Sequence, residues 1–138
     1  NYISNDGGDE GISIADDGVV SIANINTEGG SLSIGNDCTS TGADSISLGT
    51  ECDATASTSM ALGNFALASA ATSFALGRYV TASGINSLAM GTGSGPLETS
   101  TASGSGSIVL GETCTASAAN SFAAGEGSDA TAISAVGM

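Results

Sequence analysis

The amino-acid sequence predicts an all-β fold, a parallel β-roll in which each 14-residue repeat forms one rung of two short strands. The first observation behind this prediction is a recurring phrase of Ser, a large apolar residue, Ser or Ala, a large apolar residue, and Gly. Successive copies lie 14 residues apart, except across one interval of 20. A short fixed period indicates a solenoid, in which every repeat stacks on the next. The copies close at Gly35, Gly49, Gly63, Gly77, Gly91, Gly111 and Gly125.

The composition is the second observation, and it favours a thin solenoid over a conventional globular core. The 138 residues include 21 Gly, three Phe, two Tyr and no Trp, and a solenoid rung needs few large side chains. Arg78 is the only Lys or Arg against 14 acidic residues, and the net charge is -13. Such a chain has no cationic surface for phosphate groups, which argues against nucleic acid and anionic lipid as partners.

The first 28 residues do not follow the repeat. Two apolar segments, 11–14 and 19–22, flank an Asp-Gly pair and predict a β-hairpin. We expect residues 1–28 to form a connector or cap over the open end of the roll, because an exposed sheet edge needs covering. Residues 29–138 then form the roll.

Each rung contains two segments in which buried-type and polar residues alternate. After Gly63, small residues such as Ala66 and Ala68 recur at every second position, which is typical of a strand with one buried face. The repeat phrase alternates in the same way and predicts the other strand. We expect its large residues, such as Phe74 and Leu76, to point into the core against the small ones. The closing Gly suits a sharp turn with positive φ.

This arrangement leaves the small residues of the phrase on an outer face. None of them is charged, which is unusual for a solvent face in so acidic a protein. We therefore predict an oligomer packed along this column, with the Thr/Asp face of the other strand outward. The predicted contact residues between chains are Ser45, Ser47, Ser59, Ala61, Ser73, Ala75, Ser87, Ala89, Ser121 and Ala123.

The interval of 20 residues carries an insertion of six. Alignment with the neighbouring repeats places these residues within 92–100, where the only proline of the chain lies. An insertion in a solenoid leaves the stack as a loop on one face. Two interpretations of Pro96, Leu97 and Glu98 stay open: a loop that contacts a receptor, or a neutral surface excursion.

Two aromatic residues and the single arginine form a second candidate contact surface. Phe65 and Tyr79 each follow a closing Gly by two residues, and Arg78 is adjacent to Tyr79. These side chains could bind a sugar or a protein, or they could pack between neighbouring chains. We favour packing, because aromatic residues are enriched in interfaces.

Two segments resemble a known family: Asn86-Ser87-Leu88-Ala89-Met90-Gly91 and Asn120-Ser121-Phe122-Ala123-Ala124-Gly125. Both look like the head repeats of trimeric autotransporter adhesins of the YadA type, which also recur in phage tail-fibre proteins. The resemblance extends over residues 31–138. It implies a left-handed parallel β-roll, a homotrimer and a role at a surface.

The three cysteines share one position of the repeat. Cys38 and Cys52 are expected to be neighbours at a Cα separation compatible with a disulfide, but they point the same way, which makes good geometry difficult. We therefore interpret Cys38, Cys52 and Cys114 as small buried thiols. The absence of His and of a CxxC motif argues against a zinc site, and we expect no metal or cofactor.

The function that these observations favour is a structural and adhesive segment of a trimeric surface fibre. A phage or viral tail fibre involved in host attachment is preferred, because thiols suit assembly in a reducing cytoplasm. The alternative is the head domain of a bacterial trimeric autotransporter adhesin. The expected location is a virion fibre or the extracellular cell surface. The expected partners are the other two chains of the trimer and an unknown glycan or protein receptor. We do not expect this segment to insert into a membrane.

Two further classes of function are weaker alternatives. Outward Thr-x-Thr/Ser pairs resemble ice-binding solenoids, although Asp53, Leu67 and Asp129 interrupt the array. An enzyme is not expected, because the chain lacks His, Lys and a recognisably spaced carboxylate pair. The phrase recurs once more at the end of the sequence and stops at Met138, one residue before its closing Gly. We expect a longer array or end-to-end stacking of copies.

Overall fold

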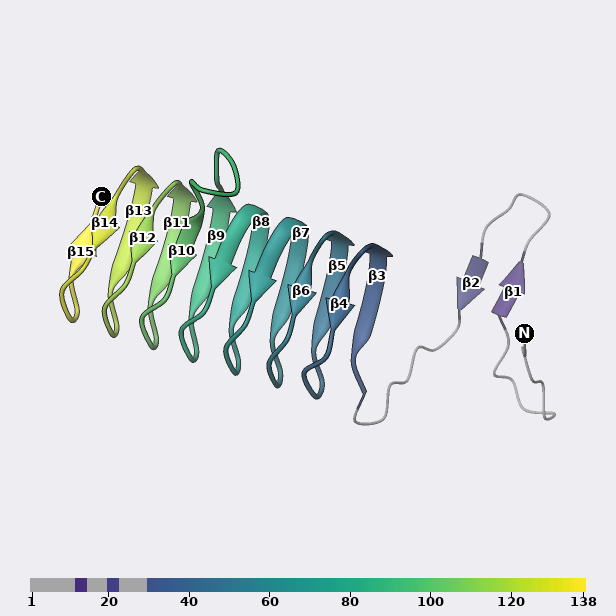
Figure 1. Cartoon of the computed structure of the whole chain (residues 1–138). Coiled ribbons are helices and arrows are strands. Elements are labelled where there is room, and N and C mark those ends of the chain that lie inside the picture. The colour runs from purple at the N-terminus through teal and green to yellow at the C-terminus, as the bar shows by residue number, and fades with distance from the viewer. Residues whose placement is uncertain (1–11, 15–19, 23–29) are drawn as a thin grey trace.

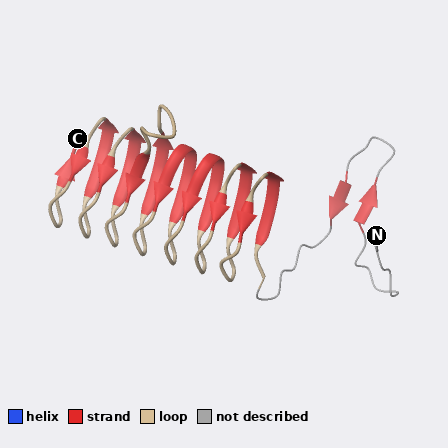
Figure 2. Ribbon diagram, viewed as in Figure 1, coloured by secondary structure: helices blue, strands red, loops and turns tan. Residues whose placement is uncertain are grey.

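The computed structural model describes residues 12–14, 20–22 and 30–138. Residues 30–138 wind into a regular stack of rungs, with a single loop projecting from one edge (Figure 1). The described residues form strands joined by turns and loops, and none of them is helical (Figure 2). The predicted all-β parallel solenoid is therefore confirmed.

The hairpin predicted near the N-terminus is confirmed. Strand β1 (Ile12–Ile14) pairs in antiparallel fashion with β2 (Val20–Ile22), and Ile12 lies opposite Ile22. The predicted Asp-Gly turn lies outside the described residues, as does the rest of the proposed connector or cap.

The repeat phrase forms the first sheet of the roll. Its strands pair in parallel and in register, so that Leu32 lies beside Ile46 and Leu88 beside Ile108 across the insertion. Along the stack they are β3 (Leu32–Asn36), β5 (Ile46–Thr50), β7 (Met60–Ala68), β8 (Phe74–Ala82), β9 (Leu88–Thr92), β11 (Ile108–Glu112), β13 (Phe122–Glu126) and β15 (Val136–Gly137).

The second sheet consists of shorter parallel strands. Strands β7 and β8 continue through the corner of the rung and contribute their C-terminal halves to it. The other members are β4 (Thr39–Ser40), β6 (Asp53–Ala54), β10 (Ser100–Ala102), β12 (Thr115–Ala116) and β14 (Asp129–Ala130). Each regular rung thus contributes one strand to each sheet, as the 14-residue period predicts.

The closing Gly of each repeat from Gly35 to Gly111 is required for two physical reasons, of which Gly125 shows only the positive φ. Gly77 has a φ of 137°, a conformation that residues with a side chain rarely adopt. A Cβ on Gly77 would also lie 1.8 Å from the carbonyl oxygen of Gly91 in the next rung. The predicted positive φ is confirmed, and the backbones of successive rungs approach too closely here for any side chain.

The Ser that begins the phrase closes the opposite turn with its hydroxyl at Ser45, Ser59, Ser73 and Ser121. The Ser87 and Ser107 hydroxyls have no hydrogen-bond partner among the described residues. The Ser73 hydroxyl donates to the carbonyl oxygen of Ala70 at 2.6 Å, and the Ser73 amide donates to the same oxygen at 3.1 Å. Thr72 supplies the left-handed residue of this turn, with a φ of 54°. The Thr72 amide donates to Ser57 of the preceding rung at 3.0 Å, so the turns also stack in a ladder.

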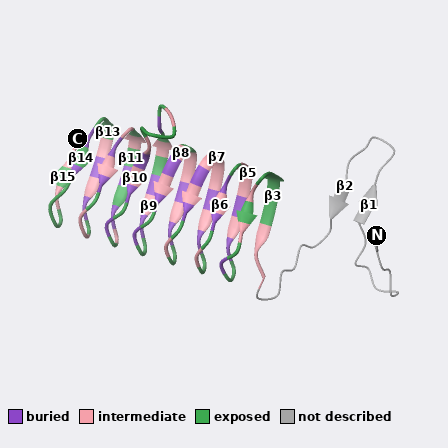
Figure 3. Cartoon of the chain, in the orientation of Figure 1, coloured by how far each residue is buried: buried purple, intermediate pink, exposed green. Residues whose placement is uncertain are grey.

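The prediction that the large side chains fill the core is wrong. The interior of the rung around Gly77 contains Ser73, Ala75, Val80 and Ala82, which are all 0–1 % exposed. The large residues of the phrase are half-buried or exposed (Figure 3). Because they alternate with the buried small residues along the strand, they point outward. Two tight turns hold the sheets so close that only Ser, Ala, Cys or Val fits between them.

The predicted contact column between chains is wrong for the same reason. Its residues are between 0 and 2 % exposed within a single chain, so they cannot contact another chain. They form the core of the roll together with the small residues of the second sheet. The corrected residues are Ser45, Ser47, Ser59, Ala61, Ser73, Ala75, Ser87, Ala89, Ser121 and Ala123.

The outer side of the first sheet is instead the apolar surface of the roll, which we call the apolar face. It consists of two columns of outward side chains that are half-buried or exposed. The first column is Leu32, Ile46, Met60, Phe74, Leu88, Ile108, Phe122 and Val136, and the second is Ile34, Leu48, Leu62, Leu76, Met90, Leu110 and Ala124. At about 4.8 Å per rung, the seven intervals of the first column extend over roughly 35 Å.

The close approach at the closing glycines generates a stability prediction. Gly77→Ala should lower the free energy of unfolding by about 3 kcal/mol or more, because it combines a strained φ with a clash against Gly91. Gly95→Ala is the matched control, since a Cβ there meets nothing within 4 Å, and it should change stability by less than about 0.5 kcal/mol. Chemical denaturation followed by circular dichroism measures both. Equal losses would contradict the assigned role of Gly77.

Candidate functional site

The insertion replaces a single corner residue of the rung. Arg78 and Val80 pair with Thr92 and Ser100 of the next rung. Residues 93–99 therefore occupy the position that Tyr79 alone occupies in the preceding rung. The corresponding residues of other rungs, including Tyr79 and Thr113, have φ values near 50°. The corner side chain points away from the stack, so additional residues can leave here without disturbing either sheet.

Hydrogen bonds fix the base of the loop. The buried Ser100 hydroxyl lies 2.8 Å from the carbonyl oxygen of Thr92 and 3.0 Å from that of Gly111. The Gly93 amide donates to Arg78 at 2.6 Å, and the Thr113 amide donates to Thr92 at 3.0 Å. The rungs on either side of the insertion are therefore bonded to the two ends of the loop.

The tip of the loop is a tight turn that exposes its side chains. The Glu98 amide donates to the carbonyl oxygen of Gly95 at 3.1 Å, and Pro96 occupies the second position, where its fixed φ suits a β-turn. Leu97 is 98 % exposed, and Pro96 and Glu98 are exposed as well. These three candidate residues form one solvent-facing tip.

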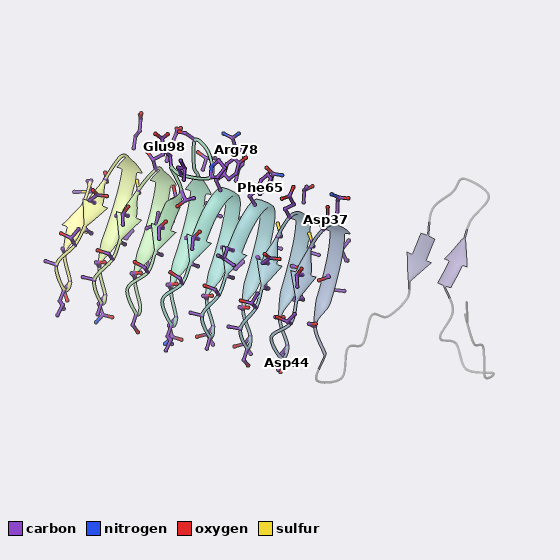
Figure 4. All side chains as sticks on the ribbon, viewed as in Figure 1. Asp37, Asp44, Phe65, Arg78 and Glu98 are labelled. Carbon is purple, nitrogen blue, oxygen red and sulfur yellow. The ribbon has the colours of Figure 1, made fainter. Side chains whose placement is uncertain are left out.

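The aromatic residues and the arginine lie together beside the loop. The rings of Phe65 and Tyr79 stack with centroids 4.8 Å apart and an angle of 11° between their planes. The guanidinium carbon of exposed Arg78 lies 5.5 Å from the centre of the Tyr79 ring, and Nη2 donates to the carbonyl oxygen of Gly93 at 3.3 Å. Phe65, Arg78 and Glu98 lie along the same edge of the roll, opposite the edge that carries Asp44 (Figure 4).

The other side of the loop forms an acidic groove, which is the second part of the candidate site. The groove has a volume of about 580 Å³ between the loop, the corner and the outer side of the second sheet. Carboxylates from the loop, from two consecutive corners and from β14 line it: Glu98, Glu112, Glu126 and Asp129. Glu112 and Glu126 are register partners in adjacent strands, where like charges repel.

Sequence reasoning did not identify this groove. The period could have shown that Glu112 and Glu126 share a column, since they are 14 residues apart. Their approach to Glu98 depends on how the loop bends toward the second sheet, which the spacing does not reveal. The six candidate surface residues divide between the aromatic pair with its arginine and the loop tip, and Arg78 connects the two through its bond to Gly93.

Among residues 12–14, 20–22 and 30–138, no group of His, Cys, Asp and Glu side chains could hold a metal ion. The same residues include no helix that could span a membrane. The three cysteines are unpaired thiols. Burial raises the pKa of the Cys52 thiol, which keeps it protonated and weakly nucleophilic at neutral pH.

Comparison with known protein families identifies the repeat. The family model of the YadA head domain repeat, in two copies, matches residues 54–79, 81–94 and 102–128. The matched span runs from the second sheet of one early rung past the insertion to the acidic groove. A comparison with curated protein sequences gives no match.

The aromatic stack generates a prediction about the corner. Tyr79→Asn keeps a residue that tolerates positive φ and removes the ring, so it should lower the free energy of unfolding by about 1–2 kcal/mol. Thr113→Asn occupies the same corner position without an aromatic neighbour and should change stability by less than about 0.5 kcal/mol. Denaturant titration compares the two. A Tyr79 variant as stable as the Thr113 variant would show that the stack contributes nothing.

Proposed function

The chain belongs to the family of YadA head domain repeats, and on this premise we propose that it is an adhesive segment of a trimeric surface fibre. YadA head domains form trimers, and such repeats imply a surface-exposed adhesin. In the proposed assembly, three copies of this chain pack through the apolar face, and the insertion loop stays on the outside for attachment.

The apolar face is the observation that carries this proposal. Large side chains on it remain substantially exposed in a single chain, with Ile34 at 51 %, and Met90 and Leu110 at 37 %. A continuous apolar surface of this kind usually marks a protein interface. Packing against other copies removes it from water, and the absence of charge in both columns leaves no ion to desolvate.

The polar side of the roll suits the opposite role. The residues that directly follow strands of the second sheet include Thr55, Ser69 and Ser83, which have exposed hydroxyls. The insertion loop forms its groove against the outer side of this sheet, with Thr101 and Thr115 in the wall. The loop therefore leans toward the polar side and away from the apolar face. Packing through the apolar face leaves the loop accessible.

The proposed attachment surface combines the exposed loop tip with the corner next to it. Leu97 offers an apolar contact, and Arg78 with Tyr79 offers a cation beside an aromatic ring. Because the Tyr79 ring already stacks on Phe65 of the same chain, we assign this corner to attachment and no longer to packing between chains. These groups suit a glycan or a protein receptor on a host surface. Of the two settings for such a fibre, the unpaired thiols favour a virus fibre assembled in a reducing cytoplasm. The alternative is the head of a bacterial trimeric adhesin.

Two single substitutions, each of which introduces one charge on a different side of the roll, test the assembly. Leu76→Glu places a carboxylate in the apolar face, so it should shift the protein from a trimer of 13.1 kDa chains toward monomers. Leu67→Glu is the matched control, because Leu67 is similarly half-buried but lies on the outer side of the second sheet. Sedimentation velocity measures the mass, and circular dichroism verifies that both variants keep their strands.

Two results would contradict the proposed assembly. The unmodified protein could sediment as a monomer at neutral pH, or Leu67→Glu could dissociate the trimer as effectively as Leu76→Glu. Either result would remove the apolar face as the contact between chains.

The attachment role is tested by removing the loop without disturbing the roll. Replacing residues 93–99 with a single Asn restores a 14-residue rung and should preserve the trimer and its melting temperature. Retention of the protein on immobilised glycans and host-surface glycoproteins should fall at least about tenfold, which corresponds to about 1.4 kcal/mol of binding. Unchanged retention would assign attachment to another surface, and no retention of the intact trimer would favour a purely structural segment.

A further inference from the structure

Two cysteines lie side by side inside the first two described rungs of the roll. Strands β3 and β5 pair in register, as do β4 and β6, and this places Cys38 next to Cys52. The Thr39 amide donates to the carbonyl oxygen of Cys52 at 2.8 Å, which holds the two segments together at this point.

The third cysteine occupies the same position of the repeat in a different setting. Register pairing places Ser100 on one side of Cys114 and Ser128 on the other. The Cys114 thiol donates to the carbonyl oxygen of Gly125 at 3.2 Å and lies 3.3 Å from that of Glu112. Cys114 thus provides an internal control for a buried thiol in the same column with hydroxyl neighbours.

The two thiols of Cys38 and Cys52 differ in their exposure to solvent. Cys38 is half-buried, whereas Cys52 is fully buried. A small oxidant from solution therefore reaches Cys38 first and leaves Cys52 as the second thiol to react. In exchange between thiols and disulfides, the accessible thiol attacks first and a neighbouring thiol then resolves the mixed disulfide.

The place of Cys38 in the stack removes the main geometric objection to a bond. Neighbouring parallel strands bring Cα atoms to about 5 Å, within the range of disulfides, but side chains that point the same way need a small displacement to join. Cys38 and Cys52 lie just outside the strands, directly before β4 and β6, so this displacement breaks none of the register pairs between those two strands.

From these observations we propose that Cys38 and Cys52 form a redox site whose intrachain disulfide fastens one rung to the next. Oxidised glutathione serves as the oxidant. The Cys38 thiolate attacks one sulfur of the glutathione disulfide, forms a mixed disulfide with one glutathione and releases the other as a thiolate, which takes up a proton. Cys52 then loses its proton, attacks the sulfur of Cys38 and releases the second glutathione. Two protein thiols are oxidised, and one glutathione disulfide is reduced to two thiols.

The proposed consequence is local. In a solenoid, a rung is stabilised mainly by the rungs that it contacts, and single rungs can open locally. A covalent bond between Cys38 and Cys52 would suppress that opening. Rungs around Cys114 should be unaffected, because Cys114 lies several rungs away.

The test uses the complete chain exposed to oxidised glutathione, followed by alkylation in denaturant and peptide mass spectrometry. We expect one Cys38–Cys52 bond per chain, with Cys114 alkylated as a thiol. Amide exchange over residues 32–54 should slow at least about threefold after oxidation and be unchanged over residues 108–130. Cys114→Ser should form the same bond, and Cys38→Ser should leave Cys52 as a thiol. Ser already occurs in this column at Ser100 and Ser128, so both variants suit the fold.

Several results would overturn the proposal. Glutathione that stays attached to Cys38 while Cys52 remains a thiol would show that the second step does not occur. A bond between different chains, or oxidation of Cys114 to the same extent, would show that the pairing within the column gives no selectivity. Unchanged amide exchange in the oxidised protein would remove the proposed fastening of the rung.

Discussion

The narrowness of the rung is the constraint on which the rest of this structure depends. Each rung encloses side chains no larger than Val80, because two tight turns hold the sheets close together. The closing glycines make one of those turns possible, since a Cβ on Gly63 would lie 1.9 Å from the carbonyl oxygen of Gly77. Four of the Ser hydroxyls help to close the other turn, as Ser59 does by donating to Ala56 at 2.6 Å.

The large apolar residues lie outside as a consequence of that narrowness. A core of Ala, Ser, Cys and Val leaves no volume for Phe74 or Leu76, so these side chains cover the outer side of the first sheet. A single chain of this design is incomplete in energetic terms, because it leaves an apolar surface in water. The proposed assembly through the apolar face therefore follows from how each chain packs its own interior.

The corners of the roll explain why the candidate site lies at an edge. Left-handed corner residues such as Tyr79 and Thr113 have φ values near 50°, which costs side-chain-bearing residues about 1 kcal/mol each. Backbone ladders offset this cost, as when the Thr113 amide donates to Thr92. The corner side chain lies outside the core, so residue type and even loop length can vary there. Aromatic rings, carboxylates and the insertion accordingly collect along one edge.

Much of the architecture could be predicted from the spacing of residues alone. The 14-residue period predicted parallel strands in register, the vertical pairing of Phe65 with Tyr79 and the neighbourhood of Cys38 and Cys52. The loop position followed from matching the repeats on either side of the insertion. The acidic groove could not be predicted, because its shape depends on the bend that brings Glu98 toward Glu112 and Glu126.

The sequence by itself determined the repeat, the strands, the turns and the two faces of each strand. Only the tertiary structure decided which face is inside. Alternation at a period of two separates Ser73 and Ala75 from Phe74 and Leu76, but it does not say which of the two sets is buried. That choice depends on the volume that a closed 14-residue rung can enclose, which is a property of both turns and both strands together. In this protein that volume admits only the small side chains, and the large ones are left to face other molecules.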